Sequence, residues 1–291
     1  MSLPLPLCYL NGAYLPLTEA RVSPLDRAFL FGDAVYEVVP VYGGRPFRLR
    51  EHLDRLNRSL EAIRMAAPLS HPQWGAVCAR LVEQGGGNEC YVYIQVSRGA
   101  EFGRNHAWPA GLTPTLFAYA TAVEPVPAQL IEKGVAAVTA PEIRWERRDI
   151  KSTALLANVL LKKLAADAGA FETIMLEDGA LTEGSSTTVH VIAEGVIHTP
   201  PNGHHILPGT TRDVVTELAA RLKMTGTAVR VPETMLRSAD EIWLGFATRG
   251  VLPVTVLDGK AVGGGKPGPM FMRMHAAFSG YTRELAGTPP L

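Results

Sequence analysis

The sequence is poor in cysteine and carries no net charge. Its three cysteines, Cys8, Cys78 and Cys90, are odd in number and form no CxxC pair, so we expect reduced thiols that pack in the core. No metal is expected. Lys and Arg together number 28, and Asp and Glu also number 28, which excludes the charge imbalance typical of proteins that bind nucleic acid or anionic membranes.

Long apolar runs are missing as well. No segment approaches the ~20 apolar residues of a membrane span. The segment from Met1 to Pro6 has no basic residues and is broken by prolines, so no signal peptide is expected. These absences predict a cytoplasmic protein.

What is present is the composition of a compact globule, with 47% hydrophobic and 19% charged residues. Helical and strand patterns occur in mixed order without regular βαβ alternation, which favours an α/β chain of two α+β lobes over one doubly wound sheet. The best linker candidate is Glu124 to Pro127. The predicted elements are hairpins at Asn11-Gly12 and Asp178-Gly179, strands over 34–42, 91–97, 115–121, 135–140, 171–176, 187–192 and 242–246, and helices from Glu51 to before Pro68, over 72–84 (stopped by glycines 85–87), over 152–168 and from Thr210.

A lysine and a carboxylate lie 183 − 151 = 32 residues apart, in Asp149-Ile150-Lys151-Ser152 and Thr182-Glu183-Gly184-Ser185. Pyridoxal phosphate (PLP) chemistry needs an amine that forms a Schiff base and moves a proton, and an acid that pairs with the pyridine nitrogen. Lys151 and Glu183 could supply both. The alternatives are a surface lysine in a basic segment and a glutamate that caps a turn.

Two further segments could bind anions. Leu207-Pro208-Gly209-Thr210-Thr211 precedes a predicted helix, whose free N–H groups suit a phosphate, although an ordinary Thr N-cap is the alternative. Arg55 could add a bidentate contact, but the helical spacing favours a solvated arginine. Arg104 and His106, two positions apart on a loop, could trap a carboxylate or could simply be solvated.

Six ordered blocks carry a family resemblance that spans about residues 8–260. The chain resembles the fold-type IV PLP enzymes, which include D-amino acid, branched-chain and (R)-amine transaminases and aminodeoxychorismate lyases. The blocks are Asp26-Arg27, Phe31 to Val38, Glu51 to Leu56, Asp149 to Ser152, Thr182 to Ser186 and Gly209 to Val214.

The resemblance implies two α/β domains, 1–121 and 131–291, joined by an interdomain loop at 122–130 with PLP between them. The second domain would carry the Schiff-base residue Lys151. The resemblance also implies a homodimer whose subunits share active-site loops. The cofactor-binding residues that it implies are Lys151, Glu183, Arg55, Thr210, Thr211, Leu207 against the ring, and Ala247.

Within the family, Tyr36 with Arg104 and His106 is similar to the D-amino acid aminotransferase pattern. The resemblance implies that these three groups bind the substrate carboxylate and that the arginine and the histidine reach across from the partner subunit. The segment Gly245 to Gly250 departs from the family's Ser/Thr-rich loop. Ala247 offers the phosphate only its backbone N–H, and Arg249 could crowd the pocket, bind a second carboxylate or face solvent.

The expected function is PLP-dependent transamination between D-amino acids and 2-oxo acids such as pyruvate or 2-oxoglutarate, by a ping-pong mechanism. An (R)-amine or branched-chain L-amino acid transaminase is the alternative within the family, and the lyase branch fits Tyr36, Arg104 and His106 less well. A non-catalytic α/β binding protein is the alternative outside the family.

Overall fold

The computed structural model describes residues 4–85 and 87–287. By its internal contacts the described part of the chain divides into two compact units. Unit 1 comprises the described residues up to 124, residues 150–154 and those from 283 on, and unit 2 comprises residues 125–149 and 155–282. The sequence predictions for the extreme N-terminus and for the helix stop at Gly86 involve positions outside the described residues. The mixed α/β architecture with two sheets confirms the predicted fold class.

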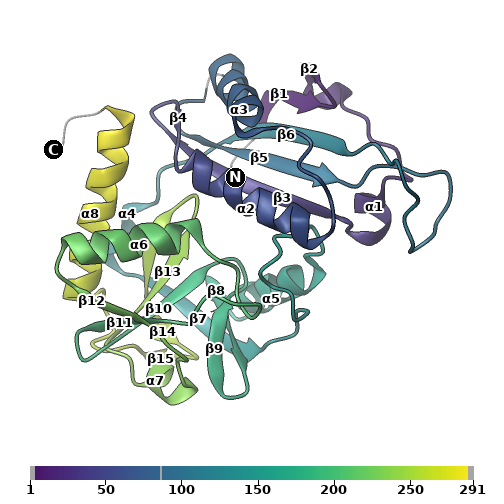
Figure 1. The fold of residues 1–291 in the computed structure, drawn as a ribbon. Coiled ribbons are helices and arrows are strands. Elements are labelled where there is room, and N and C mark those ends of the chain that lie inside the picture. Colours follow the sequence, from purple (N-terminus) through teal and green to yellow (C-terminus); the bar gives the residue numbers. More distant parts are fainter. Residues whose placement is uncertain (1–3, 86, 288–291) are drawn as a thin grey trace. The chain divides into compact units, whose positions relative to one another are not determined.

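Unit 1 is built on a six-stranded antiparallel sheet of order β2-β1-β6-β5-β3-β4 (Figure 1). The predicted hairpin at Asn11-Gly12 is confirmed, with both residues in the left-handed region at φ 50° and 94°. In the order of the sheet, β3, which contains Pro40, is next to the edge, and the edge strand β4 has two residues. The strands are β1 (Pro4–Leu10), β2 (Ala13–Pro16), β3 (Ala34–Tyr42), β4 (Arg45–Pro46), β5 (Cys90–Ser97) and β6 (Thr115–Ala122).

Two helices of unit 1, α2 (Leu49–Ala62) and α3 (His71–Gly85), bury their apolar residues in the same core as the sheet (Figure 1). Leu53, Leu56 and Leu60 of α2 are buried, as the helical spacing predicted. A short helix, α1 (Arg27–Phe31), was not predicted. Its N-cap is Asp26, whose carboxylate accepts the Ala28 N–H at 2.8 Å.

Residues 150–154 group with unit 1, whereas the sequence placed Lys151 in the C-terminal domain. The physical reason is pairing with β3, since Val35 and Ser152 form an antiparallel bridge and the Tyr36 N–H donates to the Lys151 carbonyl at 2.9 Å. The same pairing explains why the helix expected from residue 152 begins only at Leu156.

Unit 2 contains a nine-stranded mixed sheet of order β12-β11-β10-β13-β14-β7-β8-β9, with β15 paired to β14. Neighbouring strands are parallel in the pairs β7–β8, β7–β14 and β11–β12. The strands are β7 (Val135–Pro141), β8 (Glu172–Glu177), β9 (Ala180–Gly184), β10 (Thr188–Ala193), β11 (Val196–Thr199), β12 (Thr225–Ala228), β13 (Glu241–Phe246), β14 (Gly250–Leu257) and β15 (Lys260–Ala261).

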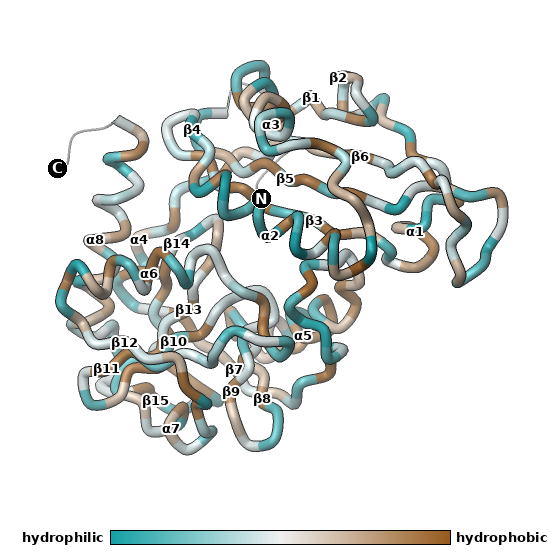
Figure 2. Tube along the Cα trace, viewed as in Figure 1, coloured by the Kyte–Doolittle hydropathy of each residue, from teal (hydrophilic) through white to brown (hydrophobic). Residues whose placement is uncertain are grey.

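Helices α5 and α6 fall where helices were predicted, and α4, α7 and α8 were not predicted. The helices are α4 (Ala128–Glu132), α5 (Leu156–Asp167), α6 (Thr210–Arg221), α7 (Glu233–Arg237) and α8 (Pro269–Ala286). Hydropathy along the chain is drawn in Figure 2. Within residues 4–85 and 87–287, no helix has both the length and the apolar character needed to cross a bilayer.

A buried histidine in β10 makes the fold sensitive to acid. Neither ring nitrogen of His190 has a hydrogen-bond partner among the described residues. Burial lowers the pKa of His190 to about 3, and Arg212 acts in the same direction. The unfolded chain therefore binds this proton below pH ~6.5 while the folded chain does not, so stability falls as the pH drops from there towards 3.

We expect His190→Phe to raise the free energy of unfolding at pH 7 by about 1–3 kcal/mol, because it removes an unsatisfied polar group. It should also abolish about 2 kcal/mol of the loss between pH 7 and pH 5. Urea unfolding at both pH values measures this, with the exposed His205→Gln as control. An equal pH dependence in wild type and His190→Phe would contradict the assignment.

Candidate active site

Lys151 lies against an aromatic side chain of unit 1. Its backbone is held by the Tyr36 N–H and by Ser59, whose Oγ accepts the Lys151 N–H at 3.2 Å. The Lys151 Nζ is 4.2 Å from the centroid of the Tyr36 ring, and that ring stacks on Tyr93 at 5.6 Å. Among the described residues no carboxylate forms an ion pair with Lys151, so the half-buried amine is positioned but not neutralised.

Arg55 is buried, which contradicts the alternative of a solvated arginine. It is 4% exposed and donates to both oxygens of Glu37 on β3, from Nε at 2.7 Å and from Nη2 at 2.9 Å. His52 Nδ1 lies 2.7 Å from the same carboxylate. Burial works to raise the pKa of Glu37, but Arg55 and His52 outweigh it and hold that pKa well below its usual range. Glu37 therefore fixes the Arg55 fork in one orientation.

Arg104 and His106 lie on the exposed loop between β5 and β6. Both contact the ring of Phe31: the Arg104 Cζ at 5.1 Å, and the His106 ring at 5.4 Å between centroids. The structure thus brings these two predicted residues together. Among the described residues, no hydrogen bond or ring contact joins either of them to Tyr36.

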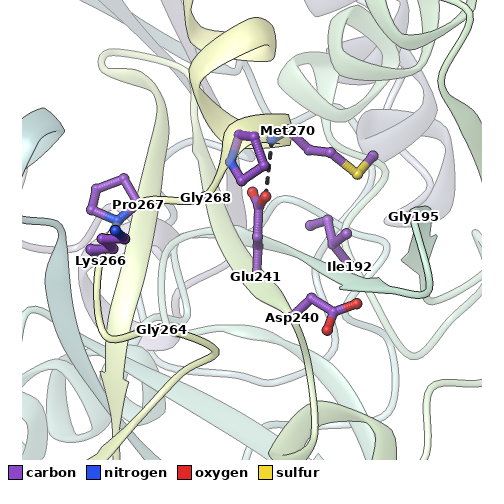
Figure 3. Close-up of a pocket in the computed structure, with 10 residues that line it drawn as sticks. Ile192, Gly195, Asp240, Glu241, Gly264, Lys266, Pro267, Gly268 and Met270 are labelled. Carbon is purple, nitrogen blue, oxygen red and sulfur yellow. Dashed lines mark hydrogen bonds between the residues drawn. The ribbon is translucent and has the colours of Figure 1, made fainter.

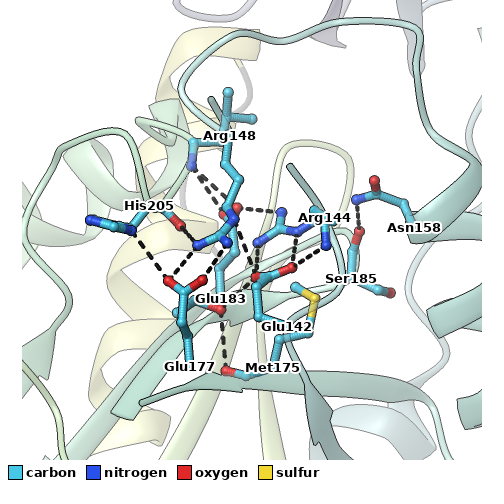
Figure 4. A network of polar contacts seen from close by, with 11 residues as sticks. Glu142, Arg144, Arg148, Asn158, Met175, Glu177, Glu183, Ser185 and His205 are labelled. Atoms are coloured by element: carbon cyan, nitrogen blue, oxygen red, sulfur yellow. Dashed lines mark hydrogen bonds and ion pairs between the residues drawn. The ribbon is translucent and has the colours of Figure 1, made fainter. Parts of the chain in front are cut away.

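In unit 2, Glu183 is buried near the end of β9, beside Arg144 (Figure 4). Its Oε1 accepts from Arg144 Nη1 at 2.6 Å and from the Leu207 N–H at 3.2 Å. Arg144 also donates to Glu142 from Nη2 at 2.6 Å. Burial raises the pKa of Glu183, and Arg144 opposes that rise.

The sequence interpretation missed Arg144 and its partner Glu142. They follow β7 two positions apart, a spacing that puts side chains on one face of an extended segment. That spacing could have indicated the pairing of Arg144 with Glu142, but it does not indicate that Arg144 also pairs with Glu183. The two arginines of the basic segment before Lys151 are also paired, Arg147 with Asp149 and Arg148 with Glu177.

The start of α6 forms an open backbone cradle. The N-cap is Gly209 and no side chain caps the helix, so the alternative of a Thr N-cap is wrong. A Cβ on Gly209 would lie 2.7 Å from Thr188 Oγ1, so a larger residue there would have to displace the Thr188 side chain. Thr210 and Thr211 are buried in the first turn. Free N–H groups and the positive end of a helix suit a phosphate.

The turn from β13 to β14 carries the last two predicted residues. Ala247 is half-buried there, and Arg249 is exposed with its Cζ 5.8 Å from the Phe171 ring centroid. Just before the turn, a Cβ on Gly245 would lie 3.6 Å from Thr211 Cγ2, so this strand end borders the first turn of α6.

A separate hollow of about 310 Å³ lies at the start of α8 (Figure 3). Glu241, one of its lining residues, accepts the N–H groups of Met270 at 2.9 Å and Phe271 at 2.8 Å, and that of the Trp243 indole at 2.8 Å. This carboxylate is occupied in capping the helix, and the hollow contains none of the predicted site residues.

The family model described as Amino-transferase class IV matches residues 34–257. This chain belongs to the class IV aminotransferases. It is 38% identical over 267 residues to D-alanine aminotransferase of Bacillus licheniformis, a match that covers 92% of this chain and 94% of that protein.

Solved structures of branched-chain amino acid aminotransferases share the fold. Branched-chain amino acid aminotransferase of Escherichia coli superposes with a TM-score of 0.88 at 26% identity, over 94% of this chain and 93% of that one. A second branched-chain amino acid aminotransferase, the T.th. enzyme with pyridoxamine 5′-phosphate, gives a TM-score of 0.88 at 26% identity, over 98% and 95% of the two chains.

Proposed function

We propose that this class IV aminotransferase moves amino groups between D-amino acids and 2-oxo acids, with PLP as cofactor. The observation that carries the proposal is the similarity to D-alanine aminotransferases over nearly the whole chain. The cofactor fits the residues present, because unit 2 offers free backbone N–H groups at the start of α6 and a buried carboxylate, and unit 1 offers an amine with no ion-pair partner among the described residues.

When bound, PLP supplies an aldehyde that reacts with amines and a ring that stores the electron pair left by proton removal. Lys151 Nζ would bind the aldehyde of the cofactor and would move the proton of the donor α-carbon. Glu183 would hold a proton at the pyridine nitrogen, and Leu207 would pack against the ring. Arg55, Thr210, Thr211 and the backbone N–H of Ala247 would bind the phosphate.

The substrate carboxylate is bound by Tyr36, Arg104 and His106 in this proposal. A fixed carboxylate decides which enantiomer presents its α-hydrogen to Lys151. Arg249 binds the second carboxylate of 2-oxoglutarate or D-glutamate, and it has no carboxylate partner among the described residues.

The enzyme works in the cytoplasm as a homodimer, with active-site loops shared between the subunits. An apolar stripe on α5 supports a second copy as partner, because helical positions i, i+3, i+4 and i+8 share one face. Leu156, Val159, Leu160 and Leu164 are exposed there by 73%, 60%, 55% and 44%.

We expect Leu160→Glu to shift the protein towards the monomer, because it places a charge in the proposed interface. Sedimentation velocity at micromolar concentration measures this. Lys260→Glu, which changes an exposed lysine of β15 away from this helix, serves as the control and should leave the dimer intact. A wild-type chain that sediments as a monomer would refute the dimer.

Product analysis tests the function. The PLP-loaded enzyme supplied with D-alanine and 2-oxoglutarate should form pyruvate and D-glutamate, resolved by chiral chromatography. The structural similarity to branched-chain enzymes favours L-leucine as the competing donor. Formation of L-glutamate from L-leucine, with no product from D-alanine, would establish that alternative instead.

A further inference from the structure

The loop of residues 98–114 between β5 and β6 is longer than the roughly 12–15 residues that an irregular loop usually reaches. It contains no helix or strand. Phe102, Arg104 and His106 are exposed near its tip. Side chains that bind a small carboxylate must be held in a fixed position, so the backbone of such a loop has to be fixed by contacts with other groups.

Both ends of this loop are fixed by Asp26. Its carboxylate accepts hydrogen bonds from the Ser97 hydroxyl and, at 2.6 Å, from Thr115 Oγ1, the residues on either side of the loop. Arg27 adds a backbone bond, from its N–H to the Gly99 carbonyl at 2.9 Å. Gly99 has φ 103°, and a Cβ there would lie 2.0 Å from the Thr113 carbonyl oxygen, so the loop closes tightly at its base.

The tip of the loop is held by the Arg27 side chain, which is only 2% exposed. Its Nη1 donates to the carbonyl of Asn105 at 2.7 Å and to the Glu101 carboxylate, and its Nη2 donates to the carbonyl of His106 at 3.0 Å. Its Nε donates to Asp33 at 2.8 Å. The two carbonyl bonds fix the peptide groups that follow Asn105 and His106.

Aromatic contacts complete the arrangement. The ring of Phe31 lies 4.7 Å from the Arg27 Cζ, and Arg104 and His106 contact the same ring. Arg98 shares Asp33 with Arg27, at 2.8 Å, and lies 4.0 Å from the centroid of Trp108 further along the loop.

We propose that Arg27 is a positioning residue for substrate binding: its hydrogen bonds to the Asn105 and His106 carbonyls hold Arg104 and His106 where they bind the substrate carboxylate. The inference rests on the proposed role of those two residues. Since the guanidinium fork reaches two carbonyls and two carboxylates at once, neither lysine nor an apolar residue reproduces it.

The test compares Arg27→Met, which keeps the length of the stem but removes every donor, with Arg21→Met. Arg21 is exposed, and within the described part of the chain its side chain donates only to the carbonyls of Thr18 and Ala20. For the holoenzyme, Arg27→Met should raise the KM for D-alanine about tenfold and change kcat less than about threefold. Arg21→Met should change neither.

A double-mutant cycle separates positioning from general damage. If Arg27 acts through Arg104 and His106, Arg27→Met should cost little further in kcat/KM on a background that carries both Arg104→Ala and His106→Ala. If Arg27→Met lowers kcat/KM by the same factor on this background as in the wild-type enzyme, the inference is overturned. If Arg104→Ala itself leaves the KM for D-alanine unchanged, the proposed carboxylate role of Arg104 fails instead.

A measurement without turnover gives the second readout. Trypsin should cleave after Arg104 at least about tenfold faster in Arg27→Met than in Arg21→Met, because loop opening sets the rate. Cleavage at other sites should be unchanged. Equal cleavage after Arg104 in the two variants would show that Arg27 does not hold the loop.

Discussion

Lys151→Ala is expected to lower transaminase turnover by at least about 10⁴-fold and to abolish the visible absorbance band that an amine-bound PLP gives. The amine is the only proposed group that both binds the cofactor aldehyde and moves the α-proton. Its neighbours should be little disturbed, since the contacts that hold residue 151 in place are made by its backbone and survive truncation of the side chain.

The matched control is Lys163→Ala, which removes an exposed lysine of α5. It should retain both turnover and the band. The measurement is an absorbance spectrum of PLP-loaded protein together with the rate of pyruvate formation from D-alanine. A Lys151→Ala protein that keeps either property would remove Lys151 from the mechanism.

Glu183→Gln is expected to leave PLP bound but to slow proton transfer by about 100-fold or more, because a neutral amide cannot hold a proton at the pyridine nitrogen. The fold should tolerate the change. The glutamine oxygen can still accept from Arg144, and that arginine remains paired with Glu142.

Glu177→Gln is the control, since it removes another carboxylate paired with an arginine in the same part of unit 2. Its turnover should stay within about threefold of wild type. A single-turnover isotope effect with α-deuterated D-alanine checks that the slowed step in Glu183→Gln is proton removal. Unchanged turnover in that variant would refute the role of the carboxylate.

Much of the fold follows from local sequence signals. The strand over 34–42 and the hairpins at Asn11-Gly12 and Asp178-Gly179 were predicted from β-propensity and turn residues alone. Residue 152 shows the limit of such signals. The local pattern predicted that a helix begins there, but the residue pairs with Val35 of β3, which is distant in sequence, and the helix begins at Leu156. The missed helix α1 is too short for periodicity to reveal it.

Site residues divide in the same way. Glycine at 209 before two threonines indicates an open helix start, and the structure has one. The burial of Arg55 was not predictable from its helix, because the cause is Glu37 on another element. Arg144 and Arg27 act through groups far away in sequence, so no local spacing identifies their partners.

The central claim is most directly tested by a half-reaction spectrum. Purified, PLP-loaded protein is mixed in parallel with D-alanine, L-leucine and (R)-1-phenylethylamine, and the visible band of the bound cofactor is followed. We predict rapid loss of the band with D-alanine and not with the other two donors. Loss with L-leucine or with the amine, and none with D-alanine, would contradict the D-amino acid assignment and leave the cofactor chemistry in place.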